Sequence, residues 1–264
     1  MQNDKAEYIH PEEVKELLFF YNELGWTETI EEKPINRFEQ KFEPAKSNIQ
    51  ELDSKQQSSR LIPKESATQV AQTLAKKAID LDQLKSAMAT FKFCDLRKGA
   101  RNIVFGDGNP TSKTMIIGDA PNPLEDRQGM PFVGDEGELL DKMFSAIGLS
   151  RNSNGLAGIY VTTIIPWKPL HTQSSISTEI EMLFPFIERH IQLINPRFLV
   201  LMGSYPSTEL FHGIGGNEQS AKWGKFLGID TVKIHHPRHL IKNPSAKKET
   251  WKNLQELKAR LDEA

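Results

Sequence analysis

The chain is poor in cysteine, and this scarcity excludes several kinds of site. It has one cysteine, Cys94, among 264 residues. No disulfide can therefore form within the chain, and cysteines alone cannot build a zinc site or an iron–sulfur cluster. The chain also lacks a large net charge, because 35 acidic residues nearly balance 33 basic ones. Such a chain has no strong overall attraction for long nucleic acids, although a local basic patch would still bind phosphates.

Long apolar runs and a signal segment are missing as well. No apolar run approaches the roughly 20 residues that a membrane-spanning helix needs. The first five residues lack the basic and then apolar order of a signal peptide. We therefore expect a cytoplasmic protein without a membrane partner. Hydrophobic residues make up 38% of the chain and charged residues 26%, which is enough to build a packed core.

The N-terminal quarter differs in composition from the rest. Apolar side chains at helical spacing before Gly25 predict a helix within residues 1–28. Residues 29–65 are rich in Glu, Lys, Gln, Ser and Pro, which predicts a flexible linker. Regular apolar patterns begin afterwards, so we expect the folded domain over residues 66–264. A helix on a tether is a candidate docking element for a protein partner.

The pattern after the linker indicates an α/β protein. Two consecutive helices are predicted over residues 66–91, because the apolar stripe changes phase near Asp80. Further on, short apolar strands alternate with amphipathic helices, which is typical of a parallel sheet between helical layers. We expect a three-layer αβα fold with a central, mainly parallel four-stranded sheet and an N-terminal helical extension. The predicted strands are Thr114–Ile117, Ile159–Ile165, Phe198–Met202 and Thr231–Ile234.

Three helices are predicted among and after these strands. The first ends at Gly148, and the second begins with a capping box of Thr178 and Glu181. The C-terminal helix is expected to bury a stripe that includes Trp251 and Leu254.

Ligands of such sheets bind beyond the carboxyl ends of the strands. Three segments follow the predicted strands: residues 118–134, 162–170 and 235–244. In the first of them, Gly118 and Ala120 are small enough to let a ligand approach the backbone.

The first segment also contains four residues whose side chains could take part in binding or catalysis. Asp119 would lie at the mouth of the strand, where a carboxylate can orient a water, and Phe132 offers an aromatic face for a base. A purely structural role in a tight turn stays open for both. For Glu125 and Asp126 we favour a solvated acidic patch.

The second and third segments hold the other candidates. Thr163 is β-branched and suits a strand, while its hydroxyl would also be able to contact a base; both interpretations stay open. Trp167 is expected in the core. The third segment contains His235, His236 and His239. We expect no metal site there, because the stretch has no carboxylate or cysteine and neighbouring residues of a strand point to opposite sides.

These segments resemble the motifs of the family 4 uracil-DNA glycosylases. The family's Gly-Glu-Ala-Pro-Gly loop corresponds to Gly-Asp-Ala-Pro-Asn at residues 118–122, and its Pro-Phe-Val-Gly motif to residues 131–134. Its His-Pro segment, with a following Asn-Pro and a helix containing Trp, corresponds to residues 236–251. The resemblance runs from about Phe91 to the end. It implies hydrolysis of the N-glycosidic bond of uracil, or of another deaminated base, in DNA.

The resemblance also implies roles for single residues. His236 matches the catalytic histidine, which stabilises the departing base anion. Asp119 stands where the family has a glutamate that serves the water, and Thr163 where it has an asparagine that reads the uracil edge. The residues expected to bind the base are Gly118, Ala120, Phe132 and Thr163.

The expected partner is DNA with one base flipped out of the helix, bound by a monomer. Lys222 and Lys242 are candidate contacts to the DNA backbone. The alternative is a catalytically weak or inactive DNA-binding or damage-sensing module on the same fold. Departures from the family at Asp119, Asn122 and Thr163 favour this alternative.

Family 4 enzymes hold an iron–sulfur cluster with four cysteines. The corresponding positions in this chain are Phe91, Cys94, Trp167 and Leu183, and three of them carry no metal ligand. We therefore predict that the chain uses no cofactor, and that apolar packing replaces the cluster.

Overall fold

The computed structural model describes residues 64–169, 176–210 and 222–263. The predicted helix within residues 1–28 lies outside the described residues, as does almost all of the predicted linker over residues 29–65.

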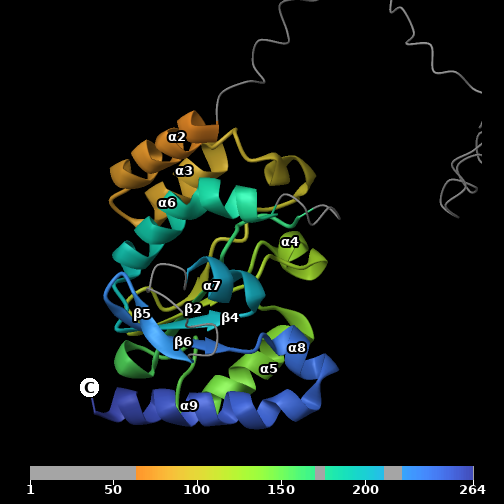
Figure 1. The fold of residues 1–264 in the computed structure, drawn as a ribbon, viewed down its shortest axis with the longest axis vertical. Coiled ribbons are helices and arrows are strands. Elements are labelled where there is room, and N and C mark those ends of the chain that lie inside the picture. The colour runs from red at the N-terminus through yellow and green to blue at the C-terminus, as the bar shows by residue number, and fades with distance from the viewer. Residues whose placement is uncertain (1–63, 170–175, 211–221, 264) are drawn as a thin grey trace, which may run out of the picture. The chain divides into compact units, whose positions relative to one another are not determined.

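The centre of the fold is a mixed six-stranded sheet with the order β1-β3-β2-β4-β6-β5 (Figure 1). Its strands are β1 (Asp107–Gly108), β2 (Thr114–Gly118), β3 (Ile159–Thr163), β4 (Phe198–Met202), β5 (Trp223–Phe226) and β6 (Ile229–Ile234). The four central strands are parallel, and β1 and β5 join the two edges in the antiparallel direction. The predicted α/β class and the four predicted strands are confirmed. The predicted number of strands is wrong, because two edge strands extend the sheet.

Burial explains the central strands. Every residue of β2, β3 and β4 is buried, as expected for parallel strands covered on both faces. The edge strand β5 forms a hairpin with β6 through Leu227 and Gly228, whose φ angles are 51° and 79°. Two positive φ values suit a two-residue turn with the twist of the flanking strands.

Helices cover both faces of the sheet. They are α2 (Lys64–Lys77), α3 (Leu81–Thr90), α4 (Pro123–Gln128), α5 (Gly134–Ser145), α6 (Ile176–Ile194), α7 (Ser204–Glu209), α8 (Pro237–Lys242) and α9 (Lys247–Asp262), with 3-10 turns at Asp95–Gly99, Gly155–Ala157 and Pro244–Ala246. Figure 1 shows α2, α3 and α6 on one side of the strands and α5 and α9 on the other. Two hydrophobic clusters match these layers, because Met115 and Ile117 of β2 belong to one and Ile116 to the other.

The change of phase near Asp80 marks a real boundary. The helix α2 ends at Lys77, and the side chain of Asp80 caps α3 by accepting a hydrogen bond from the N–H of Gln83 over 2.7 Å. The prediction of two consecutive helices is therefore confirmed.

Two details of the other helices were predicted wrongly. Thr178 lies inside α6, which already includes Ile176, so it does not begin the helix. Trp251 is 41% exposed, because α9 turns Thr250 and Asn253 inward beside Leu254. Among the described residues, no helix is long and apolar enough to cross a membrane.

Candidate active site

A cleft of about 720 Å³ opens at the carboxyl ends of the parallel strands. Asp119 enters it directly after β2, and Gly203 and Ser204 enter it directly after β4. His235 and His236 follow β6 and line the same cleft. This is the edge of the sheet where a parallel α/β fold binds its ligands.

The cleft brings together half of the predicted site residues. Asp119, His236, Lys222 and Lys242 all line it. The four residues predicted to bind the base lie outside this lining, and each of them is buried: Gly118, Ala120, Phe132 and Thr163.

His236 is held as a neutral ring with a defined proton. It is the N-cap of α8, and its Nδ1 accepts a hydrogen bond from the backbone N–H of Arg238 over 3.2 Å. An accepting Nδ1 carries no proton, so the proton of the neutral ring lies on Nε2. Burial, with a smaller effect from the charge of Arg238, lowers the pKa of His236 to about 4. At neutral pH the ring is therefore an uncharged Nε2–H donor.

An ion pair fixes the surroundings of this ring. The guanidinium of Arg238 donates to both carboxylate oxygens of Glu136 on α5, over 2.8 and 3.1 Å. Glu136 Oε2 also lies 3.9 Å from His236 Nδ1. This second contact is no ion pair at neutral pH, because burial keeps His236 uncharged. The Arg238–Glu136 pair joins α8 to α5 beside the cleft.

The neighbouring His235 has a different environment. Its side chain is 40% exposed, against 7% for that of His236. Its ring stacks on that of His239 at 5.0 Å, and its Nε2 lies 3.5 Å from Glu249. The rings of His235 and His236 both lie at the cleft, but of these two only that of His236 is withdrawn from solvent.

Asp119 is half-buried, and one of its oxygens is already engaged. Its Oδ1 accepts a hydrogen bond from the N–H of Tyr205 in the first turn of α7, over 3.0 Å. Burial raises the pKa of Asp119, while hydrogen bonds from Tyr205 and Ser204 and the charge of Arg238 lower it. The carboxylate lies against Gly203, where the φ angle is 110° and any Cβ would collide with it.

Phe132 joins the site through a strained backbone. Its φ angle is 51°, a left-handed conformation that costs a bulky residue about 1–3 kcal/mol. The ring is 1% exposed and stacks on that of His236, with centroids 5.3 Å apart and planes 23° apart. A Cβ at Gly118 would lie 2.5 Å from Phe132 Cζ, so only glycine fits beneath this ring.

The predicted solvated acidic patch is wrong. Glu125 and Asp126 are 2% and 3% exposed, and both accept backbone hydrogen bonds. Glu125 takes the N–H groups of Asn122 and Phe132, and Asp126 takes that of Arg101 over 2.9 Å. Burial raises the pKa of Glu125. The sequence signal for Glu125 was its spacing from Asn122, which forms a capping box at the start of α4.

Thr163 uses its hydroxyl within the fold. The side chain is 4% exposed and donates to the carbonyl oxygen of Ile165 over 2.8 Å, with that of Val104 3.5 Å away. This geometry fits the structural interpretation of Thr163 at the end of β3.

Comparison with known proteins identifies the family. Residues 105–258 match the model of the uracil DNA glycosylase superfamily, which is more than half of the chain. The chain therefore belongs to this superfamily, and the resemblance found in its motifs is confirmed.

The relatives point to one branch of the superfamily. The type-4 uracil-DNA glycosylase of Sulfurisphaera tokodaii is 30% identical over 190 residues, which is 67% of this chain and 84% of the relative. That of Archaeoglobus fulgidus is 27% identical over 64% of this chain and 87% of the relative. That of Pyrobaculum aerophilum is 25% identical over 67% of this chain and 92% of the relative.

These matches contradict the prediction that the chain uses no cofactor. The relatives are type-4 enzymes, the family known to carry an iron–sulfur cluster, so membership argues for a cluster rather than against one.

The residues at the four cluster positions do not fit a set of four thiolates. Phe91, Cys94, Trp167 and Leu183 are all buried in one hydrophobic cluster, and only Cys94 has a sulfur ligand. Burial, and then the neighbouring Glu179, raise the pKa of the Cys94 thiol, which keeps it protonated. Within the described ranges, no group of three or more His, Cys, Asp or Glu side chains is placed to hold a metal ion.

Proposed function

We propose that this protein is a DNA glycosylase of base excision repair, which hydrolyses the N-glycosidic bond of uracil or another deaminated base. Membership of the superfamily and the names of the relatives support this proposal. The observation that carries it is His236, a buried neutral ring that lines the cleft with its proton on Nε2.

The chemistry of base release needs such a donor. Breaking the bond between base and sugar builds negative charge on the base and positive charge on the sugar. A fixed Nε2–H of His236 would stabilise an oxygen of the departing base as that charge develops. The donor is uncharged, so it acts by hydrogen bonding and keeps its proton.

Asp119 would act on the sugar and on the attacking water. A carboxylate stabilises an oxocarbenium-like sugar and positions the attacking water. One oxygen of Asp119 is held by the N–H of Tyr205. This bond fixes the direction of the carboxylate, and the second oxygen is the one that we assign to the water.

DNA would approach through the cleft, with the base flipped out of the strand. Lys222 and Lys242 line the cleft and are proposed to contact phosphates. Phe132 is proposed to pack on the base.

An excision assay tests the proposal. Single- and double-stranded oligonucleotides would carry one uracil, hypoxanthine or xanthine, and the product would be an abasic site cleaved by mild alkali. We expect excision of at least one of these bases. Purified His236→Ala protein is the control for contaminating glycosylase. A folded parent protein that leaves all three bases intact would contradict the proposal.

A non-catalytic DNA-binding module is the second candidate. The engaged hydroxyl of Thr163 favours it, because the structure leaves no amide at this position to read the edge of a base. The same oligonucleotides distinguish the two functions: binding of damaged DNA without any excision would support the module.

A further inference from the structure

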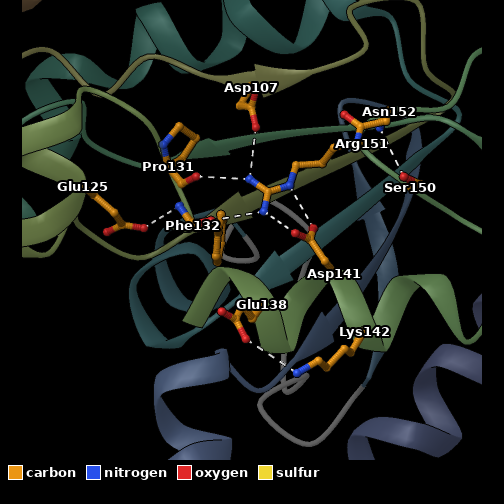
Figure 2. Close-up of polar contacts among 10 residues, drawn as sticks. All are labelled: Asp107, Glu125, Pro131, Phe132, Glu138, Asp141, Lys142, Ser150, Arg151 and Asn152. Atoms are coloured by element: carbon orange, nitrogen blue, oxygen red, sulfur yellow. Dashed lines mark hydrogen bonds and ion pairs between the residues drawn. The ribbon is translucent and has the colours of Figure 1, made fainter. Parts of the chain in front are cut away.

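Phe132 is held through both polar groups of its backbone. Its N–H donates to Glu125 Oε1, and its carbonyl oxygen accepts from Arg151 Nη2 over 3.2 Å. Figure 2 shows Glu125 and Arg151 approaching Phe132 from opposite sides. A left-handed backbone at a bulky residue persists only where its surroundings impose it, and these two contacts supply that restraint.

Arg151 uses its whole guanidinium in this place. Nε and Nη2 donate to the two oxygens of Asp141 over 2.9 and 2.6 Å. Nη1 donates to Asp107 over 3.0 Å and to the carbonyl of Pro131 over 3.4 Å. Together with the bond to Phe132, these five bonds match the five N–H donors of an arginine. The side chain is 13% exposed, and these bonds hold the guanidinium in one position.

The surrounding backbone leaves room for this arrangement. A Cβ at Gly137, in the first turns of α5, would collide with the carbonyl oxygen of Phe132 and lie 3.4 Å from Arg151 Nη2. The ring of Phe132 in turn rests on that of His236. A chain of contacts therefore runs from Arg151 through Phe132 to the ring that lines the cleft.

We propose that Arg151 and Glu125 are positioning residues, which clamp the backbone on both sides of the Phe132 Cα and thereby set the orientation of His236 in the cleft. The proposal rests on the proposed function for its effect on excision, but its effect on the Phe132–His236 ring pair does not depend on activity. Neither residue lines the cleft, and the contact that they share is the backbone of Phe132.

Three variants test the clamp. Arg151→Met keeps the length of the side chain and removes all five donors, while Glu125→Gln keeps one oxygen acceptor where two are used. Lys142→Gln is the matched control, because Lys142 forms an exposed pair with Glu138 at 3.6 Å on α5, and Figure 2 draws no contact between it and Phe132.

The first measurement is independent of activity. The ring resonances of His236 in the NMR spectrum report on the stacked ring of Phe132. We expect them to shift in Arg151→Met and in Glu125→Gln and to stay in place in Lys142→Gln. Unchanged resonances in both clamp variants would overturn the proposal. If Arg151→Met does not fold, Glu125→Gln decides alone.

The second measurement is a double-mutant cycle on the single-turnover excision rate. Arg151→Met should slow excision by about 10- to 100-fold, as a small misplacement of catalytic groups does. In a Phe132→Ala background the same substitution should have almost no further effect, because its route to His236 is gone. Equal losses in both backgrounds would show that Arg151 only supports the fold and would overturn the proposal. A parent without excision would refute the proposed function, while the NMR measurement would still decide on the clamp.

Discussion

The backbone N–H of Arg238 donates to Nδ1 of His236 over 3.2 Å, and this bond decides which nitrogen of the ring carries the proton. Because Pro237 begins α8, the same turn of helix that presents the ring to the cleft also supplies the N–H. Orientation and protonation of His236 are therefore set by one local element.

His236→Ala should reduce the rate of excision by about 10²–10³-fold, the usual loss when one such donor is removed. DNA affinity should stay nearly constant, because it depends mainly on phosphate contacts. Single-turnover kinetics and fluorescence anisotropy measure the two quantities. His235→Ala is the control, since His235 lines the same cleft but is exposed and lies beside Glu249. Equal losses of activity at both histidines would show that the assignment of His236 as the donor is wrong.

The stability of the fold should fall in acid because of its buried histidines. Burial lowers the pKa of His236 from 6.5 to about 4 and that of His190 from 6.5 to about 3. Between the folded and unfolded pKa values the unfolded chain binds a proton that the folded chain does not. The stabilisation is therefore complete above pH 6.5 and is lost as the pH falls toward 4.

For His236 alone, this change in the free energy of unfolding is about 3 kcal/mol. Urea unfolding at pH 7.5, 6.0 and 5.0 measures the part that is lost above pH 5, about 2 kcal/mol, and His236→Asn should show a shallower dependence on pH. The raised pKa values of Asp119 and Glu125 act in the opposite direction, so the difference between parent and variant is the useful quantity. Identical slopes would contradict the lowered pKa.

Gly118→Ala should displace the ring of Phe132, because the new Cβ would lie 2.5 Å from Cζ. We expect a loss of about 1–3 kcal/mol in the free energy of unfolding, as for other overpacked cores, together with slower excision. In a Phe132→Ala background the same change should be nearly neutral. A similar loss in both backgrounds would show that the ring is not the obstacle.

Thr163→Val removes a hydroxyl that donates to the carbonyl oxygen of Ile165 and keeps the shape of the side chain. We expect a loss of about 1 kcal/mol in the free energy of unfolding and an unchanged rate of excision. A marked fall in excision at unchanged stability would instead assign the hydroxyl to the substrate.

Thr163→Asn should raise the rate of uracil excision, because it restores an amide that can donate and accept at the edge of the base. The gain should remain far below the roughly 10⁴-fold of the best hydrogen-bonding sites, since Asp119 also differs from the family. Parallel assays on uracil and hypoxanthine measure it. A variant no better than the parent on uracil would remove Thr163 from the recognition site.

The sequence predicted the central fold and the principal residues of the cleft for one physical reason. Strands buried on both faces are continuous apolar runs, and the residues that follow parallel strands meet at one edge. Asp119 was found in this way, whereas the resemblance to the family singled out His236 among the three histidines of its segment. The edge strands were missed because β1 has two residues and β5 contains Gly224 and Lys225 among apolar neighbours.

The clamp on Phe132 could not be predicted in the same way. Arg151 reaches Phe132 across 19 positions of the chain and Asp107 across 44, and such contacts leave no periodic pattern. Burial of Glu125 was missed for a related reason, because a carboxylate that accepts backbone N–H groups has the same letter as a solvated one. Only the assembled structure shows which polar residues face inward.

The contact between Asp119 and Gly203 couples the substitutions that are tolerated at two positions far apart in the chain. The carboxylate rests against Gly203 and holds the N–H of Tyr205. A glutamate at position 119, the residue of the resembling family, would carry its carboxylate about 1.5 Å further, one C–C bond. The longer side chain would then lose the contact with Gly203 and the hydrogen bond from Tyr205, unless the start of α7 moved as well. The shorter acid and the turn after β4 therefore form a coupled pair, in which neither can change freely while the other stays the same.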